Sequence, residues 1–150
     1  MKKYFTLPNL LCVFIAFVFL QSLPFKFSNS LETQHIFTTL GEWSGLTWFG
    51  VYGGYLIGAA ELITAILLFT GLRSLAAVMA MGIMSGAIIF HLFTPLGIIM
   101  PLFDAATGAQ IGDDGGVLFM MACATWVCAG ILILLELKNP NSALAKLLNK

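Results

Sequence analysis

Four long apolar stretches constrain the fold of this chain more than any other feature. They cover residues 7–25, 51–69, 75–94 and 117–137, and a helix needs about 20 apolar residues to cross a bilayer core. Only 9% of the 150 residues are charged, whereas a soluble domain carries roughly 25%. Because so few charges cannot cover a water-facing surface, the sequence predicts one all-α membrane domain, a bundle of four transmembrane helices.

The first apolar stretch admits a second interpretation. Its strictly apolar part, residues 10–20, is as short as the central region of a signal peptide, and Lys2 and Lys3 precede it as in such peptides. The small residues at 28–30 form a poor cleavage site. We therefore expect a retained span, with cleavage as the alternative.

The basic residues predict the orientation of the bundle. With four spans and a cytoplasmic N-terminus, six of the seven basic residues lie on the inner side: Lys2, Lys3, Arg73, Lys138, Lys146 and Lys150. The outer segments then hold Lys26 alone among basic residues, together with the acidic residues Glu32, Glu42, Asp104, Asp113 and Asp114. This asymmetry follows the positive-inside rule, so we expect both termini in the cytoplasm.

The two outer segments differ in character. In residues 28–50, Asn29 followed by Glu32 is a capping-box pattern, and apolar residues recur at helical spacing. These features predict a short helix at the membrane interface. Residues 98–116 hold Pro101 and four glycines and predict turns, with a small hairpin around 106–108.

Glu61 lies near the middle of the second span, where a carboxylate costs several kcal/mol unless it is neutralised, hydrated or paired. Gly50, Gly54 and Gly58 repeat every four residues on the same helix, a spacing that lets another helix pack closely. Glu61 continues this stripe three residues later, so its side chain should face the bundle rather than lipid.

Two hydroxyl side chains are candidate partners of Glu61. Ser85 on the third span and Thr125 on the fourth lie at about the same depth when helical rise is counted along each span. Two interpretations of Glu61 follow. It is either a proton carrier or ligand contact in a buried pocket, or a protonated or hydrogen-bonded residue that fixes helix packing.

His91, near the outer end of the third span, is the second candidate for ligand or proton handling. It could meet Asp104, Asp113 or Asp114 at the outer surface, and the alternative is a structural histidine at a helix contact. Gly82 and Gly86 form a second glycine stripe on another side of this span, which predicts that the span packs against neighbours on two sides.

Other chemistries find little support in the sequence. Cys123 and Cys128 are not a CxxC pair, and the spacing of acidic and histidine residues predicts no metal site. The net charge is zero, which gives no basic surface for nucleic acid. No cofactor motif is evident, although a quinone could bind between the spans.

The residues 58–68, which include Glu61, are followed by Gly71 and by an alanine-rich span that ends in Ile89-Phe90-His91-Leu92. Together with the run 114–119 that opens the last span, this pattern resembles the DoxX family of small membrane proteins. The resemblance implies a four-helix membrane bundle. It also implies links to oxidoreduction of sulfur compounds and quinones, or to accessory roles for other membrane proteins.

Three functions are consistent with these features. The first is a non-catalytic accessory subunit, with a membrane-protein partner or a second copy of the chain. The second is a subunit of a quinone-linked oxidoreductase, in which Glu61 and His91 handle protons. The third is a binder or transporter of a small lipophilic molecule. For all three we expect a location in the bilayer of a bacterial cytoplasmic membrane.

Overall fold

The computed structural model describes residues 6–148, and four long helices form most of it. They are α1 (Leu7–Phe27), α3 (Thr47–Leu67), α4 (Arg73–Phe93) and α5 (Val117–Leu137), each of 21 residues. All four are long and apolar enough to cross a membrane. The prediction of an all-α, four-helix integral membrane protein is therefore confirmed. The helix bounds differ from the predicted spans by up to four residues, except in α5.

The four helices form a closed bundle. α1 packs against α3 and α5, and α4 packs against the same two helices, so α1 and α4 lie on one diagonal. Alanines of α4, Ala76, Ala77 and Ala80, are fully buried and let this helix approach the centre. Larger side chains of α1, Ile15 and Phe19, fill the space opposite them. The outer faces are apolar and exposed, as lipid contact requires.

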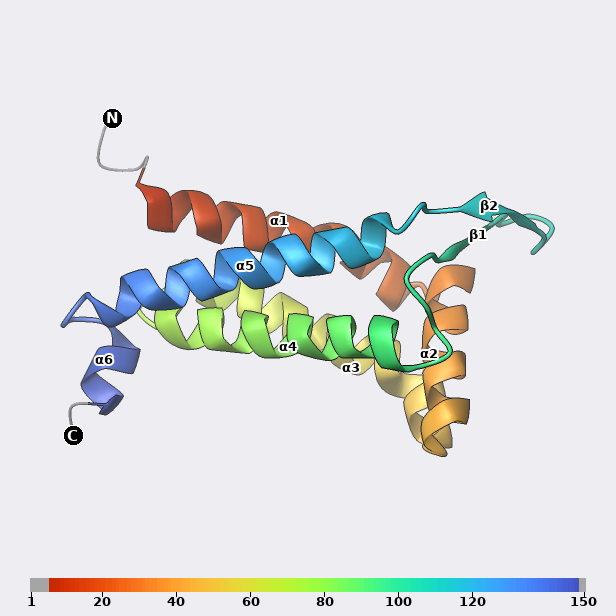
Figure 1. The fold of residues 1–150 in the computed structure, drawn as a ribbon, viewed down its shortest axis with the longest axis horizontal. Helices are drawn as coiled ribbons and strands as arrows, with labels where there is room; N and C mark the ends of the chain where they lie inside the picture. Colours follow the sequence, from red (N-terminus) through yellow and green to blue (C-terminus); the bar gives the residue numbers. More distant parts are fainter. Residues whose placement is uncertain (1–5, 149–150) are drawn as a thin grey trace.

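A fifth helix, α2 (Leu31–Ser44), lies across one end of the bundle (Figure 1). Asn29 ends α1 in the left-handed conformation (φ 52°), and the N–H groups of Asn29 and Ser30 donate to carbonyls of α1's last turn. The side chain of Ser30 then caps α2 by accepting from the N–H of Thr33. The predicted capping pair is therefore wrong: Asn29 ends one helix and Ser30 begins the next.

Glycines let α1 and α2 pack closely on α3. A Cβ atom at Gly41 of α2 would lie 2.8 Å from the Cα of Gly50. Gly54 faces Thr33 and Phe37 of α2, and Gly58 faces the last residues of α1. The predicted stripe on α3 thus borders two different helices, because α1 ends where α2 takes over the same face.

Short elements complete the two ends of the bundle. Strands β1 (Pro101–Phe103) and β2 (Gln110–Asp113) pair antiparallel beyond α2, which confirms the predicted hairpin. At the other end, α6 (Ala143–Leu148) packs against α4 and α5, and the N–H of Leu144 donates to the Ser74 hydroxyl. Figure 1 shows α6 at the same end as the start of α1, opposite α2 and the hairpin.

The charged residues follow this division of ends. Arg73 begins α4, Lys138 follows α5 and Lys146 lies in α6, so all three are at the end where α1 starts. Asp104 and Asp113 lie at the opposite end, in the hairpin. Three of the predicted inner basic residues, Lys2, Lys3 and Lys150, lie outside the described residues.

Candidate functional site

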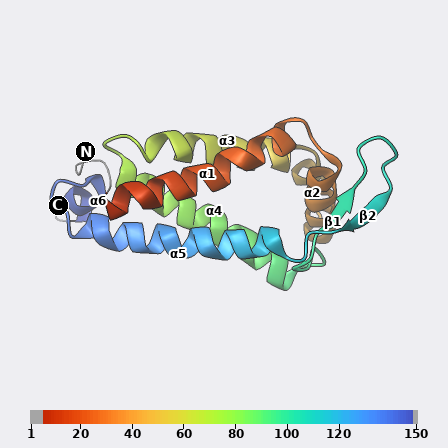
Figure 2. The ribbon, with the colours of Figure 1, turned by 90° about the horizontal axis from the view of Figure 1, so that it is seen from above.

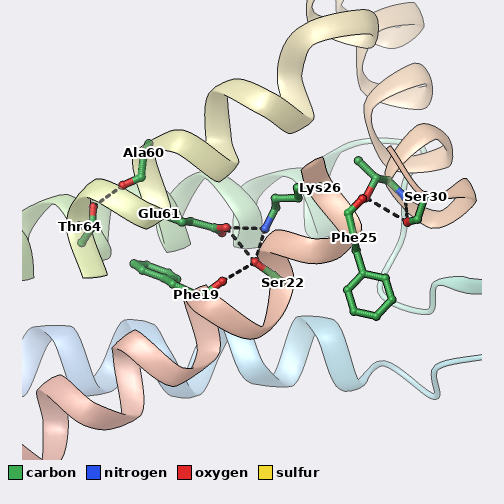
Figure 3. A network of polar contacts seen from close by, with 9 residues as sticks. Phe19, Ser22, Phe25, Lys26, Ser30, Ala60, Glu61 and Thr64 are labelled. Carbon is green, nitrogen blue, oxygen red and sulfur yellow. Dashed lines mark hydrogen bonds and ion pairs between the residues drawn. The ribbon is translucent and has the colours of Figure 1, made fainter. Parts of the chain in front are cut away.

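Glu61 of α3 is buried at 3% exposure and is held by two side chains of α1 (Figure 3). Its Oε2 accepts a hydrogen bond from Lys26 Nζ at 2.6 Å and another from Ser22 Oγ at 2.9 Å. Lys26 Nζ also lies 2.8 Å from Ser22 Oγ, so the three groups form a closed triangle. We call Ser22, Lys26 and Glu61 the polar triad. The carboxylate is thus paired and hydrogen-bonded inside the bundle, which removes most of the cost of burying it.

Gly58 explains how Lys26 reaches Glu61. The Cβ position of Gly58 lies 3.4 Å from the Cβ of Lys26 and 3.2 Å from the ring of Phe27. The end of α1 therefore packs on α3 one turn before Glu61, while the first turns of α3 continue past α1 and pack on α2. The prediction that Lys26 lies in an outer segment is wrong. Lys26 lies inside α1, with its ammonium in the bundle.

The predicted partners Ser85 and Thr125 do not meet Glu61. Ser85 Oγ donates to the carbonyl of Met81 and accepts from the indole N–H of Trp126 on α5. Thr125 Oγ1 is buried and has no hydrogen-bond partner among residues 6–148. Depth along the bundle was the basis of the prediction, but Ser85 points toward α5 and the carboxylate toward α1.

A cavity of about 450 Å³ lies beside the polar triad. All five helices from α1 to α5 contribute to it, and its lining is mostly apolar, with aromatic rings from Phe37, Phe49 and Phe90. The side chains of Ser22, Lys26 and Glu61 supply polar groups to its wall. Figure 2 shows the α1–α3 pair diverging from the α4–α5 pair toward α2.

His91 lines the same cavity from α4 and is 5% exposed. Its Nδ1 lies 2.6 Å from the carbonyl oxygen of Gly97, which assigns the proton to Nδ1 as the donor. Its ring packs edge-on against Phe119 of α5. With Nδ1–H engaged, Nε2 is the ring nitrogen that remains for another contact.

Among the three aspartates that were candidate partners of His91, Asp114 is the one that interacts with it electrostatically. Its carboxylate accepts from the N–H groups of Met100, Gly116 and Leu118, and so ties the hairpin to the first turn of α5. Partial burial favours the neutral carboxyl, but these donors and the nearby imidazole outweigh it and lower the pKa of Asp114. The described residues contain no ion pair between His91 and an aspartate.

α4 packs on two sides, against α3 and α5, as predicted, but Gly82 and Gly86 form neither contact, so the predicted packing of this glycine stripe is wrong. Both glycines line the cavity, and no atom lies within 4 Å of the Cβ position of either one. Their small size leaves space empty where a larger side chain would have filled it.

Sequence reasoning missed Ser22, Lys26 and Gln21, which all line the cavity from α1. A signal for two of them was present, because Ser22 and Lys26 are four residues apart and share one helix face. The described residues contain no group of three or more His, Cys, Asp or Glu side chains that could hold a metal ion. Cys12, Cys123 and Cys128 are free thiols.

The chain belongs to the class of integral membrane proteins with a four-helix bundle, and its cavity has a polar triad in an otherwise apolar wall. A scan against protein-family models and searches of curated proteins and of solved structures find no match to the chain. Its function must therefore be argued from the cavity itself.

Proposed function

We propose that this protein binds a small, uncharged lipophilic molecule in the cavity and holds its polar end at the polar triad. The observation that carries the proposal is the cavity of about 450 Å³ with an apolar lining and convergent polar groups. Small-molecule sites have this character, with volumes of roughly 300–1,000 Å³. The cavity lies inside the bundle, where a ligand dissolved in the bilayer would find an environment as apolar as the one it leaves.

The hydrogen bonding of the triad favours an uncharged polar end. An ammonium group has three N–H donors, and Lys26 uses two of them on Glu61 and Ser22. Both contacts to Glu61 use Oε2, and Oε1 has no hydrogen bond among the described residues. One N–H donor of Lys26 and the Oε1 acceptor of Glu61 thus remain for a ligand, which suits a hydroxyl group, since a hydroxyl both donates and accepts.

Charge balance supports the same ligand class. The ion pair of Lys26 and Glu61 is neutral as a whole, so a charged ligand gains attraction from one member and repulsion from the other. A charged group would also lose its hydration in the apolar cavity. The proposed ligand is therefore an alcohol or phenol with an apolar body.

A bromine-labelled alcohol tests this proposal. The protein is placed in lipid nanodiscs with Trp43, Trp48 and Trp126 replaced by phenylalanine, and with Phe90→Trp as the single reporter in the cavity wall. Quenching of this tryptophan reports binding of 11-bromoundecan-1-ol. The matched control ligand is 1-bromoundecane, which has the same bromine end and no hydroxyl.

The matched variant is the double substitution Lys26→Met and Glu61→Leu, which removes the ion pair and keeps side-chain volume. Two lost hydrogen bonds at about 1 kcal/mol each should weaken binding of the alcohol tenfold or more. Binding of the bromoalkane should change little. Equal loss for both ligands, or no saturable quenching in the reporter protein, would contradict the proposal.

A quinone-linked function is the second candidate, because His91 and Glu61 line one cavity. Nε2 of His91 and the triad would both face a ring bound there. If a quinol is oxidised by a partner subunit, Glu61→Gln and His91→Ala should both slow that oxidation. Unchanged rates in both variants would exclude the role.

We propose that this chain is a DoxX-like protein of a bacterial cytoplasmic membrane, with both termini in the cytoplasm. Ligand binding without turnover suits an accessory subunit, with a membrane-protein partner or a second copy. The basic residues at the end that carries α6 support the orientation. Purification in mild detergent, followed by mass measurement of the intact particle, tests for the partner.

A further inference from the structure

We infer that the ligand reaches the cavity from the hydrocarbon core of the bilayer, through an opening at Gly82 on α4. This inference rests on the proposed function, because it concerns the route by which the ligand enters and leaves. It assigns a role to Gly82 that neither helix packing nor hydrogen bonding explains.

The two glycines of α4, Gly82 and Gly86, indicate where the cavity opens. Gly82 lines the cavity and is also exposed on the outside of the bundle, so the cavity reaches the surface there. Gly86, one turn further along, is partly exposed and lines the cavity as well. A Cβ atom at either position would meet no atom within 4 Å. Ile83 and Met84 line the cavity from the same turn, so the wall lacks side chains only at the two glycine positions themselves.

The position of Gly82 along α4 places the opening in the apolar layer. It lies nine residues from Arg73 and eleven from Phe93, or about 14 Å and 16 Å along the helix axis. The exposed residues around it are apolar: Val78, Met79 and Ile89. An opening midway along a transmembrane helix and bordered by such side chains faces lipid tails rather than water.

On its other sides the cavity is lined by side chains, some of them exposed, such as Gln21 and Leu118. Between α1 and α5, Gln21 reaches across, and its Nε2 lies 3.5 Å from Sδ of Met121. At the outer end, Phe37 and Leu40 of α2 line the cavity, and α2 lies across that end in Figure 1. Entry by either route passes these side chains, whereas Gly82 itself has no side chain and open space at its Cβ position.

The test compares rates in the reporter protein, with 11-bromoundecan-1-ol as the probe and stopped-flow quenching of Trp at position 90 as the signal. Gly82→Leu should slow both association and dissociation at least fivefold and leave the equilibrium affinity within about twofold, because a gate changes rates and not the bound state. Gly82→Ala should give a smaller slowing in the same direction and is too small to disturb folding.

Gly130→Leu is the matched control. Gly130 lies in α5, also has no atom within 4 Å of its Cβ position, and does not line the cavity. Its substitution should leave both rates unchanged.

Each alternative outcome overturns a different statement. Unchanged rates in Gly82→Leu would refute entry at Gly82 while binding itself persists. A change in affinity with unchanged association would make Gly82 part of the wall and not an entrance. If the reporter protein shows no saturable binding at all, the proposed function fails and this inference fails with it.

Discussion

Replacing Lys26 alone should destabilise the bundle far more than replacing Lys26 and Glu61 together. In Lys26→Met, the carboxyl of Glu61 loses the ammonium that lies 2.6 Å from its Oε2 and retains only the Ser22 hydroxyl. The side chain of Glu61 is 4% exposed and lies in a mostly apolar cavity wall, so one hydrogen bond is left to stabilise its charge. In the double variant with Glu61→Leu, no charge remains to be solvated.

The magnitude follows from the burial of the pair. Removing one member of a buried ion pair costs about 3–5 kcal/mol, and a charged residue at the centre of a span costs about 2.5–3.5 kcal/mol by insertion scales. We therefore expect Lys26→Met to lower the free energy of unfolding by about 3 kcal/mol. The double variant should lie within about 1 kcal/mol of the natural chain, because apolar replacements of buried pairs are often neutral.

Reversible unfolding in mixed detergent micelles, followed by circular dichroism at pH 7, measures these differences. Ser22→Ala is a useful control, since it removes the two hydrogen bonds of Ser22 to Glu61 and Lys26, each of about 1 kcal/mol, and leaves the ion pair in place. A double variant as unstable as Lys26→Met would refute the reasoning. So would a single variant as stable as the natural chain, because Glu61 would then have no need of Lys26.

Three further predictions test the parts of the fold that place the cavity. Gly41→Ala should lower the free energy of unfolding by about 1–3 kcal/mol through overpacking, since the new Cβ would lie 2.8 Å from backbone atoms of α3. Gly82→Ala places its Cβ in open space and should cause no such loss. Equal losses in the two variants in unfolding experiments would contradict the packing of α2 on α3. Asn29→Val should cost about 1–2 kcal/mol in the same measurement, because φ is 52° there, and Asn29→Gly should cost nothing. The lowered pKa of Asp114 means that its contribution to stability is present at neutral pH and is lost as the pH falls below the ordinary aspartate value of about 3.9. Asp114→Asn should remove that part of the acid dependence in thermal melts across pH 3–7, and an unchanged pH profile would refute the assignment.

The sequence alone determined which segments form the long helices and that these helices are apolar enough to lie in a bilayer. Hydrophobic length predicts all four spans because a bilayer allows few other structures, and the end of α5 agrees to the residue. Glu61 could be assigned to the inside of the bundle from the glycine spacing before it, since helical periodicity fixes which residues share a face. The hairpin followed in the same way from local turn residues.

Relations between helices were decided only by the tertiary structure. The sequence places Lys26 in an outer segment, because hydrophobicity alone ends the first span before it. In the structure, α1 ends partway along α3, and α2 packs on the rest of that face of α3. Ser85 and Glu61 share a depth but point at different neighbours, since rotation of each helix about its axis depends on all its contacts.

The cavity, too, was decided only by the tertiary structure. Its wall combines residues from five helices, and a void forms where packing leaves space, which no single segment encodes. Gly82 and Gly86 show this most clearly, because the same spacing in α3 gives close helix contact and in α4 gives open space. A glycine permits close approach, but only the position of the neighbouring helix decides whether that approach occurs.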